Sequence, residues 1–129
     1  MMSFQTLMAI GSGGFIGAIL RAYLNGVINK HIPHDLPFGT FGVNLLGSLT
    51  LGILFAFFTY THFFSPTLKS LLSTGMMGAL TTYSTFALET FWLFSQGSVF
   101  LAFSNMLLNV FGTVIFAGIG FKSFEYLLK

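Results

Sequence analysis

The chain has no cysteine and very few charged residues. Without cysteine it can form no disulfide, no thiolate metal site and no thiolate nucleophile. Only 6% of its 129 residues are Asp, Glu, Lys or Arg, whereas roughly 25% is usual in a soluble domain. The basic residues are scattered, so the basic cluster that a nucleic-acid-binding protein needs is missing. These absences exclude an ordinary soluble domain and a nucleic-acid partner.

Apolar residues make up most of what is present, at 54% of the chain. They form four runs long enough to cross a bilayer as helices, which takes about 20 residues each. The runs cover residues 4–24, 38–60, 66–94 and 99–121, with short connections between them. The sequence therefore predicts an all-α, multi-pass membrane protein that consists of a single four-helix transmembrane domain over residues 1–129.

The distribution of basic residues says little about orientation. If the four runs alternate in direction, one side of the membrane receives Lys69, Lys122 and Lys129, and the other receives Arg21 and Lys30. Membrane proteins with a fixed orientation carry a clear excess of Lys and Arg on the cytoplasmic side. Because this bias is small, and pairs of glycines favour close helix contact, we expect insertion in both orientations and an antiparallel homodimer.

The third apolar run contains the most polar segment of the chain, GALTTYSTFALE at residues 78–89. Glycine and consecutive hydroxyl residues are weak helix formers, and Ser and Thr side chains compete for backbone hydrogen bonds. We therefore expect a break in the third helix near residues 76–82, where freed carbonyls could hold a cation. Simple helix packing through small residues is the alternative interpretation.

Three further features of the apolar runs are candidates for function. Glu89 is the only carboxylate inside a run, and an ionisable group at membrane depth is a functional candidate, although it could serve as a local hydrogen-bond partner. Tyr83 and Phe86 share a helical face, where their ring edges could contact an anion or pack in the core. Arg21 ends the first run and could either reach the interface or attract anions into a vestibule.

Two polar stripes run along otherwise apolar helices. The fourth run carries Asn105, Asn109 and Thr113, and the second carries Thr40, Asn44 and Ser48, in each case at four-residue spacing. This spacing places each set on one face. A buried amide without a partner is costly, so the stripes must face protein or water. They indicate either a polar path or hydrogen bonds between helices.

Three segments also resemble a known family, the Fluc (CrcB-type) fluoride channels of bacteria and archaea. They read GGFIGAILR in the first run, GTFGVNLLGSLTLG in the second and GMMGALTTYSTFALE in the third, and the resemblance covers essentially the whole chain. It implies a fluoride channel of the bacterial cell (inner) membrane. It also implies an antiparallel, dual-topology homodimer with two pores and a structural sodium ion (Na+) at its centre.

The resemblance also assigns roles to individual residues. The sodium would be held by the backbone carbonyls of Gly78 and Thr81, Arg21 would lie in the vestibule, and Glu89 would be the polar residue of the third span. The first aromatic of the pathway is usually Phe in this family and is Tyr83 here. The fluoride pathway would comprise Asn44, Tyr83, Ser84, Thr85, Phe86, Asn105, Asn109 and Thr113.

Passive fluoride export down the electrochemical gradient is thus the expected function, with membrane lipid as surroundings and no enzymatic activity. Two other functions remain open at this point. A small proton-coupled four-helix exporter could use Glu89 as its proton carrier, and a structural subunit of a larger membrane complex would have no transport activity of its own.

Overall fold

A computed structural model describes all residues, 1–129, and its only secondary-structure elements are helices. The three long helices are α1 (Phe4–His31), α2 (Phe38–Tyr60) and α6 (Val99–Leu128). Each is long and apolar enough to cross a membrane. The all-α membrane class that the sequence predicts is therefore confirmed at this level.

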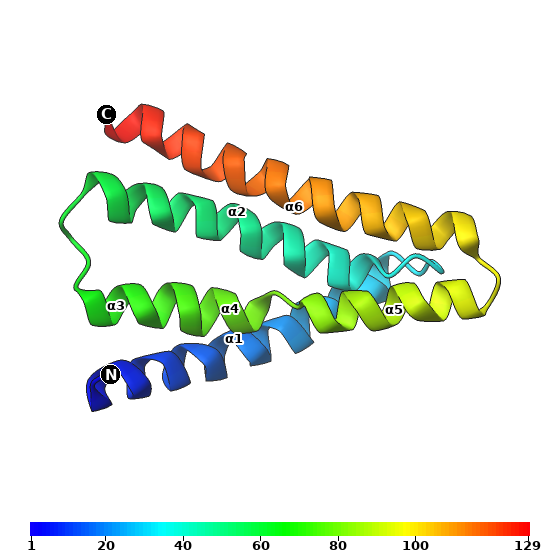
Figure 1. The fold of residues 1–129 in the computed structure, drawn as a ribbon, viewed down its shortest axis with the longest axis horizontal. Helices are drawn as coiled ribbons and strands as arrows, with labels where there is room; N and C mark the ends of the chain where they lie inside the picture. Colours follow the sequence, from blue (N-terminus) through cyan, green and yellow to red (C-terminus); the bar gives the residue numbers. More distant parts are fainter.

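The region between α2 and α6 is divided into shorter elements. These are α3 (Pro66–Ser70), the π-helix η1 (Leu71–Met77), α4 (Gly78–Leu80) and α5 (Tyr83–Ser95). Together they form one row of helices, with a short non-helical link between α4 and α5 (Figure 1). Wider π-helical turns often occur at functional positions.

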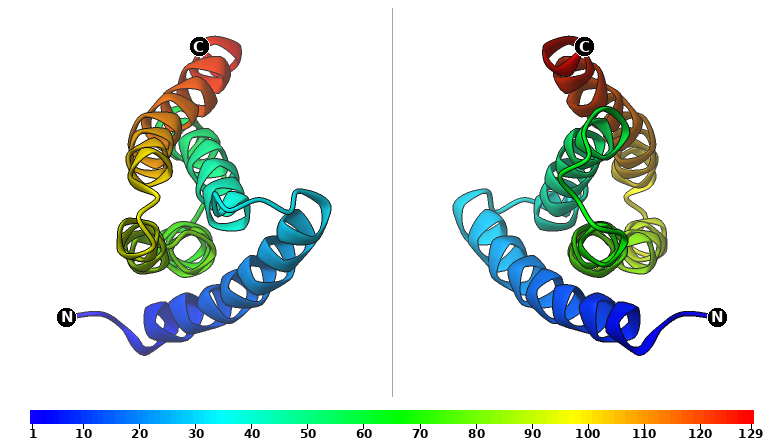
Figure 2. Two further views of the ribbon diagram at one scale, coloured as in Figure 1. Left: turned by 90° about the vertical axis from the view of Figure 1, so that its right-hand side faces the viewer. Right: turned by 90° about the vertical axis from the view of Figure 1, so that its left-hand side faces the viewer.

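The helices are arranged with both chain termini at one end of the molecule (Figure 1). The connection from α2 to α3 lies at this same end, and the connection from α5 to α6 lies at the other. Seen along the bundle, α2, α6 and the α3–α5 row form one group, and α1 crosses its outside (Figure 2).

The two outer helices are longer than their apolar runs. α1 continues to His31 and α6 to Leu128, beyond the predicted span limits at residues 24 and 121. Hydropathy marks the part of a helix that lies at membrane depth and carries no information about where hydrogen bonding stops. The extra turns carry polar side chains that pair along the helix, such as Asn29 with Asn25.

Helices α2 and α6 approach closely because each presents a glycine to the backbone of the other. A Cβ at Gly52 would overlap the carbonyl oxygen of Ala117, and a Cβ at Gly120 would overlap that of Leu49. Small residues allow this kind of close approach in membrane helix pairs. The contact fixes the separation at which side chains on the two helices can meet.

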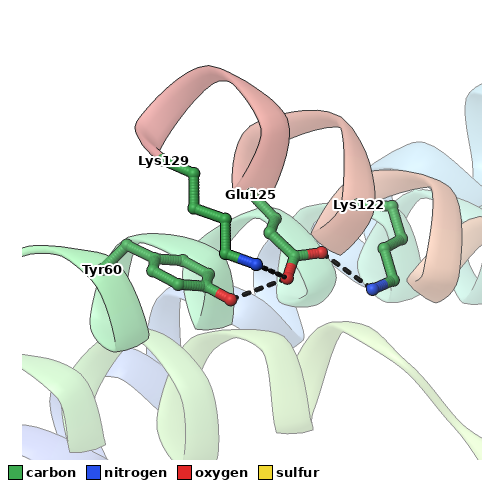
Figure 3. Close-up of polar contacts among 4 residues, drawn as sticks. All are labelled: Tyr60, Lys122, Glu125 and Lys129. Atoms are coloured by element: carbon green, nitrogen blue, oxygen red, sulfur yellow. Dashed lines mark hydrogen bonds and ion pairs between the residues drawn. The ribbon is translucent and has the colours of Figure 1, made fainter.

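The termini of α2 and α6 are joined by a polar cluster centred on Glu125 (Figure 3). Tyr60 donates its hydroxyl to Glu125 Oε1 at 2.7 Å, and Lys122 Nζ lies 2.8 Å from Oε2. Lys129 Nζ lies 3.3 Å from Oε1. Glu125 follows the apolar run, and the hydrogen bond from Lys122, reinforced by that from Tyr60, lowers its pKa to about 2.

Few large apolar side chains are buried. Val43, Met77 and Leu80 form a small core, whereas most Phe, Leu and Ile side chains on α1, α5 and α6 are exposed. Several buried residues are polar, among them Asn44, Asn105 and Asn109. An apolar exterior around a polar interior suits a protein whose outer surface faces lipid.

Candidate functional site

The candidate site is centred on the link between α4 and α5. Thr81 (φ −85°, ψ 155°) and Thr82 (φ −147°, ψ 119°) are both extended. The Thr82 amide donates to Asn44 Oδ1 at 2.8 Å, and Asn44 Nδ2 donates to the Thr82 carbonyl at 3.1 Å. The carboxamide of Asn44 thus gives the Thr82 amide an acceptor and the Thr82 carbonyl a donor. Backbone groups at membrane depth need such partners because lipid offers none.

The carbonyls of Gly78 and Thr81 are among those that lose their usual helical donors in this arrangement. In a continuous helix Gly78 would accept from the amide of Thr82, but that amide donates to Asn44. Thr81 would likewise accept from Thr85, whose amide instead donates to Thr82 Oγ1 at 3.2 Å. Freed carbonyl oxygens of this kind suit a hard cation. No group of three His, Cys, Asp or Glu side chains offers an alternative metal site.

A continuous hydrogen-bond network extends from Asn44 across α6 to α5. Asn44 Nδ2 donates to Asn109 Oδ1 at 3.1 Å, and Asn109 Nδ2 donates to Asn105 Oδ1 at 3.0 Å. Asn105 Nδ2 then donates to Thr90 Oγ1 at 2.9 Å, and Thr90 donates to the Phe86 carbonyl at 2.8 Å. The two polar stripes therefore meet inside the protein, where the side-chain amides of Asn44, Asn109 and Asn105 are hydrogen-bonded to one another.

A cavity of about 250 Å³ opens beside this network. It contains no acidic or basic side chain, only hydroxyls, amides, aromatic rings and aliphatic groups. Its lining residues are Asn44, Ser48, Leu51, Thr81, Thr82, Tyr83, Phe86, Asn109, Val110 and Thr113. A neutral lining with many hydrogen-bonding groups can contact a small polar solute without holding it as tightly as an opposite charge would.

The aromatic pair lies at the edge of this cavity. Tyr83 and Phe86 have ring centroids 5.4 Å apart and meet edge to face at 67°. Phe86 is buried at 7% exposure, whereas Tyr83 is 79% exposed, so only one of the two rings is enclosed by this chain. Ser84 and Thr85 do not line the cavity; Ser84 is exposed, and Thr85 accepts from Thr82 Oγ1 at 3.0 Å.

Glu89 belongs to a second, smaller polar region. Thr40 Oγ1 donates to Glu89 Oε1 at 2.7 Å, and Glu89 Oε2 is buried without a partner. The carboxylate borders a cavity of about 120 Å³, which Asp35 and Gln96 also line. This cavity lies at the end of the bundle where α5 finishes, so the polar groups continue from the centre of the molecule to one face.

Arg21 is half-buried on α1 and lines neither cavity. Both ion pairs in the chain involve Glu125, so Arg21 keeps its charge free of an acidic partner. Asn105 lies behind the first cavity at 1% exposure and reaches it only through Asn109.

Some functional candidates were not found from the sequence. Thr90 links α5 to the fourth-run stripe, and its position directly after Glu89, within the third apolar run, was the available signal. Asn25 and Asn29 were placed in a connection, but they lie on α1, where Asn29 contacts the start of α2. Their four-residue spacing after Arg21 could have indicated that the helix and its polar face continue.

The fold and the site define a class of protein. Exposed apolar helices surround a polar interior that reaches two cavities, of which the larger has no charged side chain in its lining. This is the organisation of a small membrane channel or transporter.

Comparison with known proteins identifies the family. The family described as "CrcB-like protein, Camphor Resistance (CrcB)" matches residues 8–121. The "Fluoride-specific ion channel FluC" of Sulfurimonas denitrificans is 59% identical over 99% of this chain and 96% of its own length. Its namesakes in Nautilia profundicola (55%, over 99% and 100%) and Campylobacter jejuni (43%, over 94% and 98%) are also similar. The chain belongs to the CrcB-like family.

Proposed function

We propose that this protein is a fluoride-selective ion channel that releases fluoride from the cell passively, and that it is not an enzyme. Relatives named as fluoride-specific channels match the chain along almost its whole length. The observation that carries the proposal is the uncharged cavity in which the Asn44–Thr82 pair lies beside Phe86 and Asn109. We place the protein in the bacterial cell (inner) membrane as a multi-pass protein.

Passage of fluoride would depend on exchange of hydrogen bonds. Fluoride is small and strongly hydrated, so it needs close donors when it loses water. The amide hydrogens of Asn44 and Asn109 are bonded to neighbouring oxygens in this structure, and the ion would replace one of these acceptors at a time. Because the donor returns to its internal acceptor when the ion leaves, binding is weak enough for conduction.

The Phe86 ring edge would supply a further contact for the ion. Aromatic edges carry partial positive charge, and Phe86 lies on the cavity next to Asn44. Ser84, Thr85, Asn105 and Thr113 would complete the polar surroundings, with Arg21 raising the local concentration of anions and Glu89 lying near one exit.

We further propose that the protein acts as an antiparallel homodimer with two pores. The α3–α5 row would be the third membrane span, interrupted at Thr81 and Thr82, so that the chain forms one four-helix domain. The exposed Tyr83 ring and the exposed Ser84 on this row would then face the second copy. The small difference in basic residues between the two ends supports insertion in both directions.

A sodium ion at the dimer centre fits the residues present here. The carbonyls of Gly78 and Thr81 have lost their helical donors, and carbonyl oxygens are suitable sodium ligands. When bound, the ion would supply fixed positive charge and join the two interrupted spans. Gly78 and Thr81 would hold it through backbone oxygen alone, so substitutions that keep the backbone conformation should be tolerated.

The proton-coupled exporter is not supported. The similar proteins are named as ion channels, and Glu89 is bonded to Thr40 outside the main cavity.

Efflux from liposomes tests the proposed function. Purified protein reconstituted into vesicles loaded with potassium fluoride should release fluoride, followed with a fluoride electrode, when valinomycin allows charge to balance. A protonophore that collapses the proton gradient should leave the rate unchanged. Loss of flux on adding the protonophore would indicate coupling to protons, and fluoride retained under all conditions would exclude the channel.

A further inference from the structure

The start of α2 is held by a side chain from α1. Pro37 precedes α2 and makes no side-chain cap, although the first amides of a helix need acceptors outside the helix. Phe38 donates its amide to the Leu36 carbonyl at 2.8 Å. Gly39 donates its amide to Asn29 Oδ1 at 2.9 Å. Asn29 therefore acts as the cap of α2, although it lies ten residues earlier in the chain, on another helix.

A second asparagine orients this cap. Asn29 Nδ2 donates to Asn25 Oδ1 at 2.6 Å, one turn earlier on α1. With Nδ2 engaged there, Oδ1 is the atom that faces Gly39. The contact also requires glycine, because a Cβ at Gly39 would overlap Asn25 Oδ1 and lie 2.6 Å from Asn29 Nδ2. The two asparagines and the glycine thus form one unit, the Asn25–Asn29–Gly39 clasp.

The clasp lies next to the hydrogen bond between Thr40 and Glu89. Thr40 follows Gly39, is almost fully buried at 1% exposure, and donates its hydroxyl to Glu89 on α5. Asn44, which pairs with Thr82, lies one turn further along α2. Any rotation or shift of the first turn of α2 therefore moves the Thr40 hydroxyl relative to Glu89 before it reaches Asn44.

We propose that Asn29, oriented by Asn25, is a positioning residue for fluoride conduction: it fixes the first turn of α2 so that Thr40 meets Glu89. This inference rests on the proposed fluoride channel function. Asn29 does not contact the ion itself. Its effect reaches the pathway through Gly39 and Thr40.

The test compares Asn29→Ala with Asn29→Asp. Asp keeps an oxygen acceptor for the Gly39 amide, and the Asn25 carboxamide can turn over so that its Nδ2 donates to the second carboxylate oxygen of Asp. Ala removes both hydrogen bonds. Protein is reconstituted at less than one channel per vesicle, so that the fraction of vesicles that empty counts channels and the emptying rate reports flux per channel. Since a cap typically shifts a helix-end equilibrium severalfold, we expect Asn29→Ala to lower flux per channel by roughly twofold to tenfold. Asn29→Asp should retain most of it.

Two further variants separate positioning from general destabilisation. A purely structural loss would reduce the fraction of active vesicles and leave the flux per channel unchanged, which would contradict the proposal. In a Thr40→Val background, Asn29→Ala should cost little additional flux, because the residue through which it acts is already gone. Full additivity of the two substitutions would overturn the proposed route.

Controls keep the outcome interpretable. Ser12→Ala, also on α1 but bonded only to its own helix at the Met8 carbonyl, should behave as the wild type. If Asn29→Ala does not assemble, Asn25→Ala replaces it and should lower flux per channel in the same direction. Wild-type flux in that variant would overturn the inference. Absence of fluoride flux in the wild type would instead refute the proposed function.

Discussion

At the scale of single residues, Asn44 joins the non-helical link of α4 and α5 to helix α6. Its carboxamide makes two hydrogen bonds to the extended backbone of Thr82 and a third to Asn109. The sequence places Asn44 in the polar stripe of the second run, and the family resemblance places it in the fluoride pathway. The structure adds that the same amide supports the non-helical link, so the residue that contacts the cavity also maintains its shape.

Replacement of Asn44 by Ala should therefore damage both stability and conduction. The Thr82 amide and carbonyl would lose their partners, at a cost of about 1 to 3 kcal/mol for each unpaired group. We expect fluoride efflux to fall to background and thermal unfolding in detergent to occur at a clearly lower temperature. Thr59→Ala, also on α2 but bonded only to its own helix at the Phe55 carbonyl, is the matched control and should behave as the wild type. A stable Asn44→Ala variant with normal efflux would reduce Asn44 to a packing residue.

Phe86 and Tyr83 allow the aromatic contribution to be separated from the hydroxyl. Phe86→Ile replaces a buried aromatic ring by an aliphatic side chain that still fills much of its volume. We therefore expect efflux to fall by more than about tenfold while the protein remains folded. Tyr83→Phe keeps the edge-to-face pair and should retain efflux. Size-exclusion profiles would establish that both variants assemble like the wild type. Unchanged efflux in Phe86→Ile would remove the ring from the pathway.

At the scale of the helices, the close contact of α2 with α6 sets the position of the network. Gly120 faces the Leu49 carbonyl without room for a Cβ, whereas nothing lies within 4 Å of a Cβ at Gly118. Gly120→Ala should cost about 1 to 3 kcal/mol through overpacking and separate Asn44 from Asn109. Gly118→Ala should cause no loss. Denaturation of the two variants in the same detergent compares them directly, and equal stability would contradict the assigned packing.

The terminal cluster of α2 and α6 gives a pH dependence with a defined sign. The pKa of Glu125 is about 2 in the folded protein, below the value of about 4.3 for an unperturbed Glu. Its contribution to stability is therefore complete above about pH 5 and is lost as the pH falls towards 2. Thermal unfolding of wild type and Glu125→Gln should differ most near neutral pH and converge near pH 2. A difference that stays constant down to pH 2 would contradict the role of the ion pairs.

Most of the helices could be predicted from the sequence, but most of the hydrogen bonds between helices could not. Long apolar runs identified α1, α2 and α6 because hydropathy is a local property of the chain. Helix ends were less accessible, since Asn25 and Asn29 are polar yet remain helical on α1. The pairing of Asn44 with Thr82 spans 38 positions and depends on how α2 packs, so spacing along one helix could not show it. Thr90 was missed for the same reason.

At the scale of the whole molecule, the proposed dimer needs both orientations in one membrane. Lysines added to the connection at residues 95–98 should bias insertion, because basic residues are retained on the cytoplasmic side. Cells that express only such a variant should remain sensitive to fluoride in the growth medium. A second copy with lysines added at residues 61–65 should restore fluoride resistance to the cells. Full activity of one biased copy alone would exclude the antiparallel dimer.

The central claim is that copies of this chain, without any other protein, form a path selective for fluoride. The most direct measurement is the reversal potential of currents through purified protein in a planar bilayer, with different fluoride and chloride gradients on the two sides. The proposed pathway predicts a reversal potential that follows the fluoride gradient and does not move when chloride is changed. A reversal potential that follows chloride, or protein that carries no current with fluoride on both sides, would contradict it.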